Sequence, residues 1–239
     1  MRIFGRNVRM PWELHSVPVE PTRSDLAPMG TLVSRAFIVI GGVEADPIRH
    51  TLAVIDSLHG DGKIPSLIAK RQVLKELAGQ FVAGQEVLIH PQTPIAEFVT
   101  AHELGHVLDF YGFTTGRNES LQGYEMMPIF DAWFASNAYR ELQTLNTRFS
   151  ESLTDPGEER IRQKQWDKVK YLLSREEFWS RAYAQWVAIS SLDPILLQQL
   201  ETLRQDPVYS RFFLQWSDDD FARIDREIYL LFKRKGWLR

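Results

Sequence analysis

His102-Glu103-Leu104-Gly105-His106 is the stretch of this chain with the most definite structural meaning. From Thr93 through this stretch, apolar residues recur at three- and four-residue spacings, a period that predicts a helix. Both histidines fall on the same stripe as the apolar residues, so we expect the helix to turn them inward. Imidazoles in an apolar interior are costly unless a metal ion or hydrogen bonds satisfy them.

The spacing of the two histidines suits a metal ion. Residues i and i+4 lie one turn apart on one face of a helix, so two imidazoles can reach one Zn²⁺ at about 2.0–2.1 Å. Glu103 points to one side of the pair, where its carboxylate can accept a proton from metal-bound water. Asp109, three residues after His106, is expected to accept a hydrogen bond from an imidazole and fix its orientation. The alternative is a helix that carries two histidines without a metal.

A third ligand must come from another part of the chain. The six histidines are His15, His50, His59, His90, His102 and His106. None follows the motif, and the chain has no cysteine, so the choice is an upstream histidine or a downstream carboxylate. His90 is the upstream candidate, although simple packing at a strand end beside Pro91 also explains it.

The downstream candidates are Glu176 and Glu177, in the segment 171–187, which is too apolar for a surface helix. The face that contains Glu177 continues with small residues such as Ala184 and Ala188. Small neighbours let a second helix approach the histidine helix closely enough for a carboxylate to reach the metal. Glu176 lies on a bulkier face. A pair of surface acids at a helix start is the simpler alternative.

The segments before the histidine helix read as strands and turns. Strands are predicted over residues 32–40, 64–69 and 86–90, because short apolar runs are bounded there by Gly or Pro. Asp46-Pro47 has the form of an N-cap followed by proline and predicts a helix that ends near Gly60. Residues 1–30 carry four prolines and are expected to form an extended arm.

Beyond Gly116 the pattern is almost entirely helical, with helices expected near 125–149, 157–173, 175–190, 193–204 and 217–234. Ser217 is expected to cap the last helix, whose acidic start and basic end suit the helix dipole. The predicted class is therefore α+β: a small N-terminal mixed sheet followed by a mainly helical C-terminal half. Residues 31–239 are expected to form one domain, with a helical extension over about 191–239.

Composition narrows the class of partner. The 239 residues are 44% hydrophobic and 25% charged, with a net charge of −3, as in ordinary soluble proteins. We therefore expect no nucleic-acid or membrane partner. No apolar run is long enough for a signal peptide or a membrane span. Together with the lack of cysteine, this predicts a cytoplasmic protein and leaves its oligomeric state open.

Two blocks of this sequence together resemble a known family. His102-Glu103-Leu104-Gly105-His106-Val107-Leu108-Asp109 and Glu177-Phe178-Trp179-Ser180-Arg181-Ala182-Tyr183 are similar to blocks in the catalytic domain of anthrax lethal factor and related zincin domains of bacterial and phage-encoded proteins. The resemblance spans roughly residues 46–190. It implies a zincin-like fold and the zinc ligands His102, His106 and Glu177. It also implies that Glu103 is the general base and that Tyr171 stabilises the transition state.

The chain departs from the family pattern at three points. Tyr171 precedes Glu177 by six residues, one fewer than the family spacing. Where a second acid often follows the ligand Glu by four positions, this chain has Arg181. Glu177 follows His106 by 71 positions, more than in compact zincins, and an inserted helix near 125–149 can fill that gap.

The sequence thus predicts a gluzincin-like zinc metalloendopeptidase that acts on a protein or peptide. Residues 86–90 are expected to be an edge strand that binds substrate by strand addition. The alternative is a catalytically silent interaction or structural protein of phage or mobile-element origin that kept a zincin scaffold. Glu103 favours the enzyme, because a purely structural zinc site needs no base.

Overall fold

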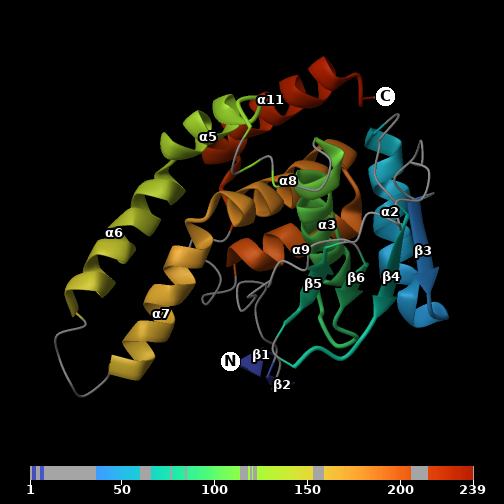
Figure 1. Ribbon diagram of the computed structural model, residues 1–239, viewed down its shortest axis with the longest axis horizontal. Helices are drawn as coiled ribbons and strands as arrows, with labels where there is room; N and C mark the ends of the chain where they lie inside the picture. The colour runs from blue at the N-terminus through green and yellow to red at the C-terminus, as the bar shows by residue number, and fades with distance from the viewer. Residues whose placement is uncertain are drawn as a thin grey trace.

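The computed structural model describes the backbone of residues 2–3, 6–7, 36–59, 66–75, 77–83, 85–113, 118, 120, 123–152, 159–205 and 215–238. These residues form a small mixed sheet and a mostly helical remainder (Figure 1), which confirms the predicted α+β class. In the predicted arm, β1 (Arg2–Ile3) pairs antiparallel with β2 (Arg6–Asn7). The rest of the arm lies outside the described residues.

The larger sheet has the strand order β3-β4-β6-β5. Its strands β3 (Phe37–Ile40), β4 (Leu67–Arg71) and β6 (Glu86–Ile89) are parallel. Parallel neighbours need a crossover connection, and α2 (Asp46–Leu58) supplies it between β3 and β4. All three predicted strands therefore exist over the residues that the structure describes.

The edge of this sheet is not where the sequence suggested. Residues 86–90 were expected at the edge, but β6 lies between β4 and the antiparallel β5 (Gly79–Val82), so that prediction was wrong. Only three residues separate β5 from β6, and Gln85 N donates to Val82 O at 3.0 Å, so a tight turn folds the chain back. Four residues that begin with glycine carry too little alternation to be recognised as a strand.

The histidine helix, α3 (Ala96–Val107), occupies the centre of the molecule (Figure 1). It contacts α2, β5, β6, α8 (Arg175–Ser191) and α9 (Pro194–Gln205). Helix α3 is therefore buried on nearly all sides rather than along one stripe, because elements from both halves of the chain pack around it. Helix α2 has the predicted apolar stripe, but Asp46 is its first residue and Ala45 its N-cap.

The helical half follows the prediction closely, except that one predicted helix is divided in two. The predicted helix 125–149 is two helices, α5 (Met127–Phe134) and α6 (Asn137–Ser152), separated by Ala135 and Ser136. Ser136 Oγ accepts from Tyr139 N at 3.1 Å, so its hydroxyl caps the second of them. α7 (Glu159–Leu172) packs along α6, and the two extend away from α3 (Figure 1).

The C-terminal helix α11 (Asp218–Lys235) connects distant parts of the chain. Ser217 caps it as predicted, accepting from Asp220 N. The carboxylate of Asp220 in turn accepts from Asn137 N at 2.7 Å and Ala138 N at 3.0 Å, so it caps α6. The acidic start of α11 therefore serves a second helix as well as its own dipole.

An aromatic cluster joins α11 to α8. Phe232 lies with its ring centroid 6.2, 6.0 and 5.0 Å from the rings of Trp179, Tyr183 and Trp186. His59, at the end of α2, packs against the same phenylalanine at 4.5 Å. The three α8 side chains are buried beneath α11.

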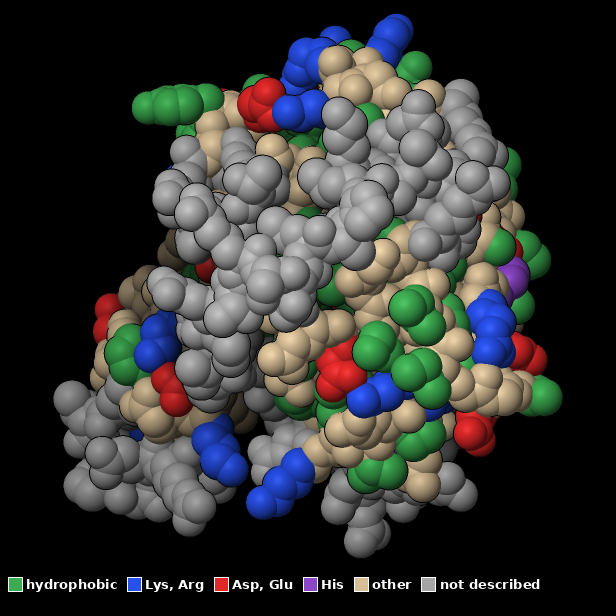
Figure 2. All heavy atoms as spheres, turned by 45° about the vertical axis from the view of Figure 1, so that its right-hand side comes forward, with side chains coloured by type: hydrophobic (Ala, Val, Ile, Leu, Met, Phe, Trp, Pro, Cys, Tyr) green, Lys and Arg blue, Asp and Glu red, His purple; other side chains and the backbone are tan. Residues whose placement is uncertain are grey.

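The described surface is mixed in charge. On the face drawn in Figure 2, Lys and Arg side chains are interspersed with Asp and Glu, in keeping with the small net charge. Among the described residues, no helix has both the length and the apolar character needed to cross a membrane.

Candidate metal centre

Two helices bring three potential ligands together. His102 and His106 come from α3, and Glu177 comes from the first turn of α8. One donor atom from each of the three lies within 4.8 Å of the others. Glu177 Oε2 is 3.4 Å from His102 Nε2 and 3.7 Å from His106 Nε2. The structure therefore places Glu177, and not Glu176, beside the histidines.

The close approach of α3 and α8 depends on Gly105. A Cβ added at Gly105 would lie 2.7 Å from Ser180 Cα, so the backbones of the two helices are nearly in contact there. Trp179 fixes the crossing, because its Nε1 donates to Gly105 O at 2.9 Å. The helices thus approach closely at two small residues, Gly105 of α3 and Ser180 of α8.

Gly105→Ala tests this account of how the helices pack. The added methyl meets backbone, which cannot rotate away, so we expect a loss of about 1–3 kcal/mol in unfolding free energy, as for other overpacked cores. Gly42→Ala is the control, since a Cβ at Gly42 meets nothing within 4 Å. Urea unfolding of both variants measures the difference. Equal stability of the two variants would contradict the packing argument.

Glu177 is held as an anion in the interior. Burial alone would raise the pKa of this carboxyl. The charge of His102, the nearness of both imidazoles and the charge of Arg181 outweigh burial and bring the pKa below its ordinary value. The backbone N–H of Glu177 also donates to Ser174 Oγ at 3.3 Å, which fixes the start of α8. A carboxylate that stays ionised and fixed in place is suited to bind a cation.

Glu103 lies beside the ligands, fully buried, against β5. The backbone of Phe81 approaches this carboxyl, but among the described residues no hydrogen bond of ordinary geometry satisfies either of its oxygens. A Cβ at Gly79 would lie 2.7 Å from Glu103 Oε1, so the backbone of β5 touches this side chain. Burial raises the pKa of Glu103 to about 8, and the charge of Glu177 adds to the rise, whereas His106 opposes it. A general base needs a pKa near the working pH, and this environment moves Glu103 in that direction.

Asp109 has a different partner from the one that the sequence suggested. It accepts from Ser120 N at 2.7 Å and from Ser120 Oγ at 2.6 Å, and no described hydrogen bond joins it to an imidazole. Asp109 lies in a π-helical turn, η3 (Leu108–Gly112), which follows α3 and differs from the α-helical spacing that the prediction assumed. Burial raises the pKa of Asp109 to about 6, while its bonds to Ser120 and the nearby His106 act in the opposite direction.

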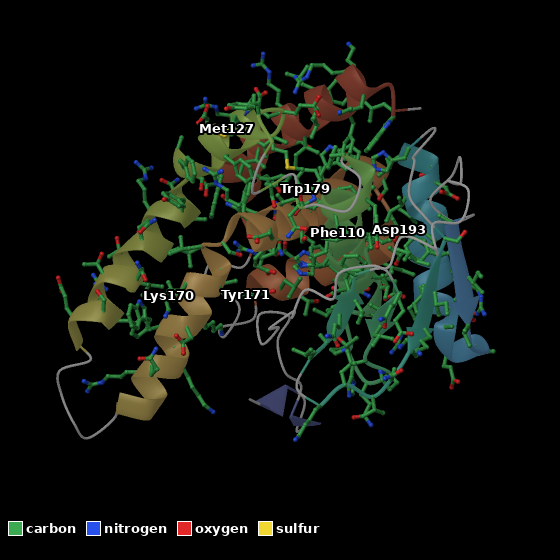
Figure 3. The ribbon with its side chains drawn as sticks, in the orientation of Figure 1. Phe110, Met127, Lys170, Tyr171, Trp179 and Asp193 are labelled. Atoms are coloured by element: carbon green, nitrogen blue, oxygen red, sulfur yellow. The ribbon has the colours of Figure 1, made fainter. Side chains whose placement is uncertain are left out.

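Tyr171 reaches the site from the end of α7. Its hydroxyl donates to Glu177 Oε2 at 2.5 Å, the same oxygen that faces the histidines. Figure 3 shows Tyr171 directed toward the central helices, whereas its neighbour Lys170 lies on the outer side of α7. Burial and the charge of Glu177 raise the pKa of the phenol, so it stays protonated and able to donate.

The other histidine candidate lies elsewhere. His90 Nδ1 accepts from Gln92 N at 3.1 Å, and His90 is not part of the group of donors. Neither Arg181 nor Gly79 was predicted from the sequence to have a role at the site. Arg181 was noted only as a departure from the family, although its position one helical turn after Glu177 is itself a signal of contact.

Comparison with known proteins gave no match: no family model, no curated protein and no solved structure matches this chain. A functional assignment therefore depends on the chemistry of the site.

Proposed function

We propose that this protein is a zinc-dependent metallopeptidase with a zincin-like fold. One observation carries the proposal: the donors of His102, His106 and Glu177 lie within 4.8 Å of one another, and the buried carboxyl of Glu103 is close enough to interact electrostatically with His106 and Glu177. Two imidazoles and one carboxylate form a ligand set that catalytic zinc sites use, and it leaves a position for water.

The polar atoms at this position support a bound cation. His102 Nε2 is buried, and no described hydrogen bond satisfies it, although it lies 3.4 Å from Glu177 Oε2. A buried polar atom without a partner is costly, and a cation between the imidazole and the carboxylate would remove that cost. The lack of cysteine and the mixture of nitrogen and oxygen donors favour zinc over softer ions.

Each residue of the site has its own role in the proposed reaction. Zinc bound here would lower the pKa of a coordinated water and polarise the carbonyl of a peptide bond. Glu103 would accept the proton of that water on its carboxylate and pass it to the departing amine. Tyr171 would donate its hydroxyl to the oxygen that gains charge, after leaving Glu177 Oε2. The last role requires a change of hydrogen-bond partner at Tyr171.

The substrate strand is proposed to bind along β5. β5 is one of the two edge strands of the described sheet, and its backbone touches Glu103. A peptide added to this edge by backbone hydrogen bonds would lie next to the base. This replaces the expectation for residues 86–90, which are already paired on both sides.

Metal binding is the first test. We expect purified protein to hold one zinc per chain, and metal-free protein to regain thermal stability on titration with Zn²⁺, by roughly 2.7 kcal/mol at a hundredfold excess over Kd. His106→Ala should lose this stabilisation, whereas His90→Ala should keep it, because His90 lies outside the donor group. Plasma emission spectrometry and calorimetry provide the measurements. Absence of zinc in protein purified without chelators would refute the proposal.

Hydrolysis is the second test, with a library of peptides as substrates and the zinc-loaded protein as enzyme. Cleavage that stops on chelation and returns with Zn²⁺ is the expected result. A chain that binds zinc but cleaves no peptide would instead favour the silent zincin scaffold.

A further inference from the structure

Arg181 lies one turn after Glu177 on α8 and is almost completely buried, with 3% of its surface exposed. Its Nη2 donates to Leu172 O, at the end of α7, at 2.8 Å. Its Nε lies 3.6 Å from Glu177 Oε1. The guanidinium also faces the ring of Trp216, 5.1 Å from the ring centroid. One side chain therefore links the first turn of α8, the end of α7 and the segment before α11.

The two oxygens of Glu177 have different surroundings. Oε1 lies on the side of Arg181. Oε2 lies near both histidines and accepts the hydroxyl of Tyr171. A carboxylate with free rotation could present both oxygens to a cation, but here the cationic partner is on one side and the donor group on the other.

Stability alone does not explain a buried arginine. The desolvation of a guanidinium costs several kcal/mol, and apolar replacements of buried ion pairs are often neutral or stabilising. The neighbours of Arg181 in this interior are themselves large apolar groups such as Trp216 and Phe178. Its rigid planar fork presents two different nitrogens, Nη2 to the carbonyl of Leu172 and Nε to the carboxylate of Glu177, whereas a lysine offers a single nitrogen.

We propose that Arg181 is a positioning residue that holds Oε1 of Glu177, so that this glutamate binds the metal through Oε2 alone. The inference rests on the proposed metal site. A single oxygen ligand leaves room in the coordination sphere for both water and a substrate carbonyl. Through Leu172, Arg181 also fixes the end of α7, and with it the distance from Tyr171 to the same carboxylate.

Cobalt substitution tests the inference, because the visible absorption of Co²⁺ is strong for four-coordinate sites and weaker for five-coordinate ones. In Arg181→Met, Oε1 is released, so we expect weaker visible absorption and a Co²⁺ affinity lower by about 10–100-fold, the usual effect of losing a residue that orients a ligand. Arg181→Lys restores the charge but not the fork, so its spectrum should lie between those of the wild type and Arg181→Met.

Gln185→Met is the matched control. Gln185 lies one turn further along α8, is buried, and exchanges two hydrogen bonds with Trp216, at 3.0 and 3.1 Å. Its loss disturbs the same packing without touching Glu177, so stability should fall while the Co²⁺ spectrum stays that of the wild type. A spectrum altered equally in this control would show that packing, not positioning, is responsible and would overturn the inference.

The outcomes separate the two proposals. Wild-type protein that binds no Co²⁺ or Zn²⁺ refutes the metal site itself. Wild-type protein that binds, with an unchanged spectrum and affinity in Arg181→Met, refutes only the positioning role. If Arg181→Met does not fold, Arg181→Lys decides: an unchanged spectrum there also refutes the role, because lysine lacks the planar fork that the role requires.

Discussion

Replacing Glu103 with Gln is expected to lower kcat/KM by roughly 10²–10⁴-fold, the usual contribution of a general base. Zinc content should stay at one ion per chain, because the change leaves His102, His106 and Glu177 intact. The amide is nearly the same size as the carboxyl, so it fits against β5 at Gly79. Peptide cleavage and metal content, measured on the same preparation, test both expectations.

The same substitution should stabilise the metal-free protein, and only at higher pH. The folded-state pKa of Glu103, about 8, lies above the unfolded value of 4.5 because burial disfavours the charge. Because the pKa is raised in the folded state, the protonated carboxyl contributes its full share to the free energy of unfolding below pH 4.5. This contribution is lost as the pH rises through about 8. Gln cannot ionise, so its advantage should grow over this range to on the order of 2–4 kcal/mol.

Glu97→Gln is the control for both measurements. Glu97 is on the same helix but binds Gln199, away from the donor group. Its substitution should change neither cleavage nor the pH dependence of stability. Full cleavage by Glu103→Gln, or a stability difference that does not vary with pH, would contradict the role assigned to Glu103.

Glu177→Gln is expected to weaken zinc binding by more than about 100-fold, because loss of a ligand exceeds the loss of a group that merely orients one. The metal-free protein should also lose stability, by about 3–5 kcal/mol, since Arg181 would remain buried without its carboxylate. Competition with a coloured chelator gives the zinc Kd, and urea unfolding gives the stability.

Glu176→Gln is a closely matched comparison, because it makes the same chemical change one residue earlier. Glu176 is only half-buried and is not among the three donors, so its Kd should match that of the wild type. A large loss of affinity in Glu176→Gln with little change in Glu177→Gln would exchange the assignments of the two acids.

The sequence predicted the elements well because their signals are local. Helical periodicity and the residues at helix starts located α2, α3 and the C-terminal helices within a few residues. The identity of the edge strand could not be predicted, because strand order depends on pairing between distant segments and β5 has only four residues. The division between α5 and α6 also depends on a distant contact, the carboxylate of Asp220.

The candidate site was predictable to the extent that it follows from spacing. A separation of four residues places His102 and His106 on one helix face wherever the helix lies, and small residues indicated how closely α8 could approach. The bonds of Asp109 to Ser120 were not foreseen, because Ser120 comes close only through the fold that follows the π-helical turn. The contact of Arg181 with Leu172 could not be foreseen, since it requires the packing of two helices.

The cover that α11 gives to α8 has a consequence for synthesis. A ribosome makes α3 and α8 well before Phe232, so the nascent chain holds all three proposed ligands while Trp179, Tyr183 and Trp186 still lack their cover. Uncovered aromatic side chains favour association with other chains. We therefore expect chains stalled before α11 to aggregate or to recruit chaperones, and the proposed peptidase to mature only after translation has passed Phe232.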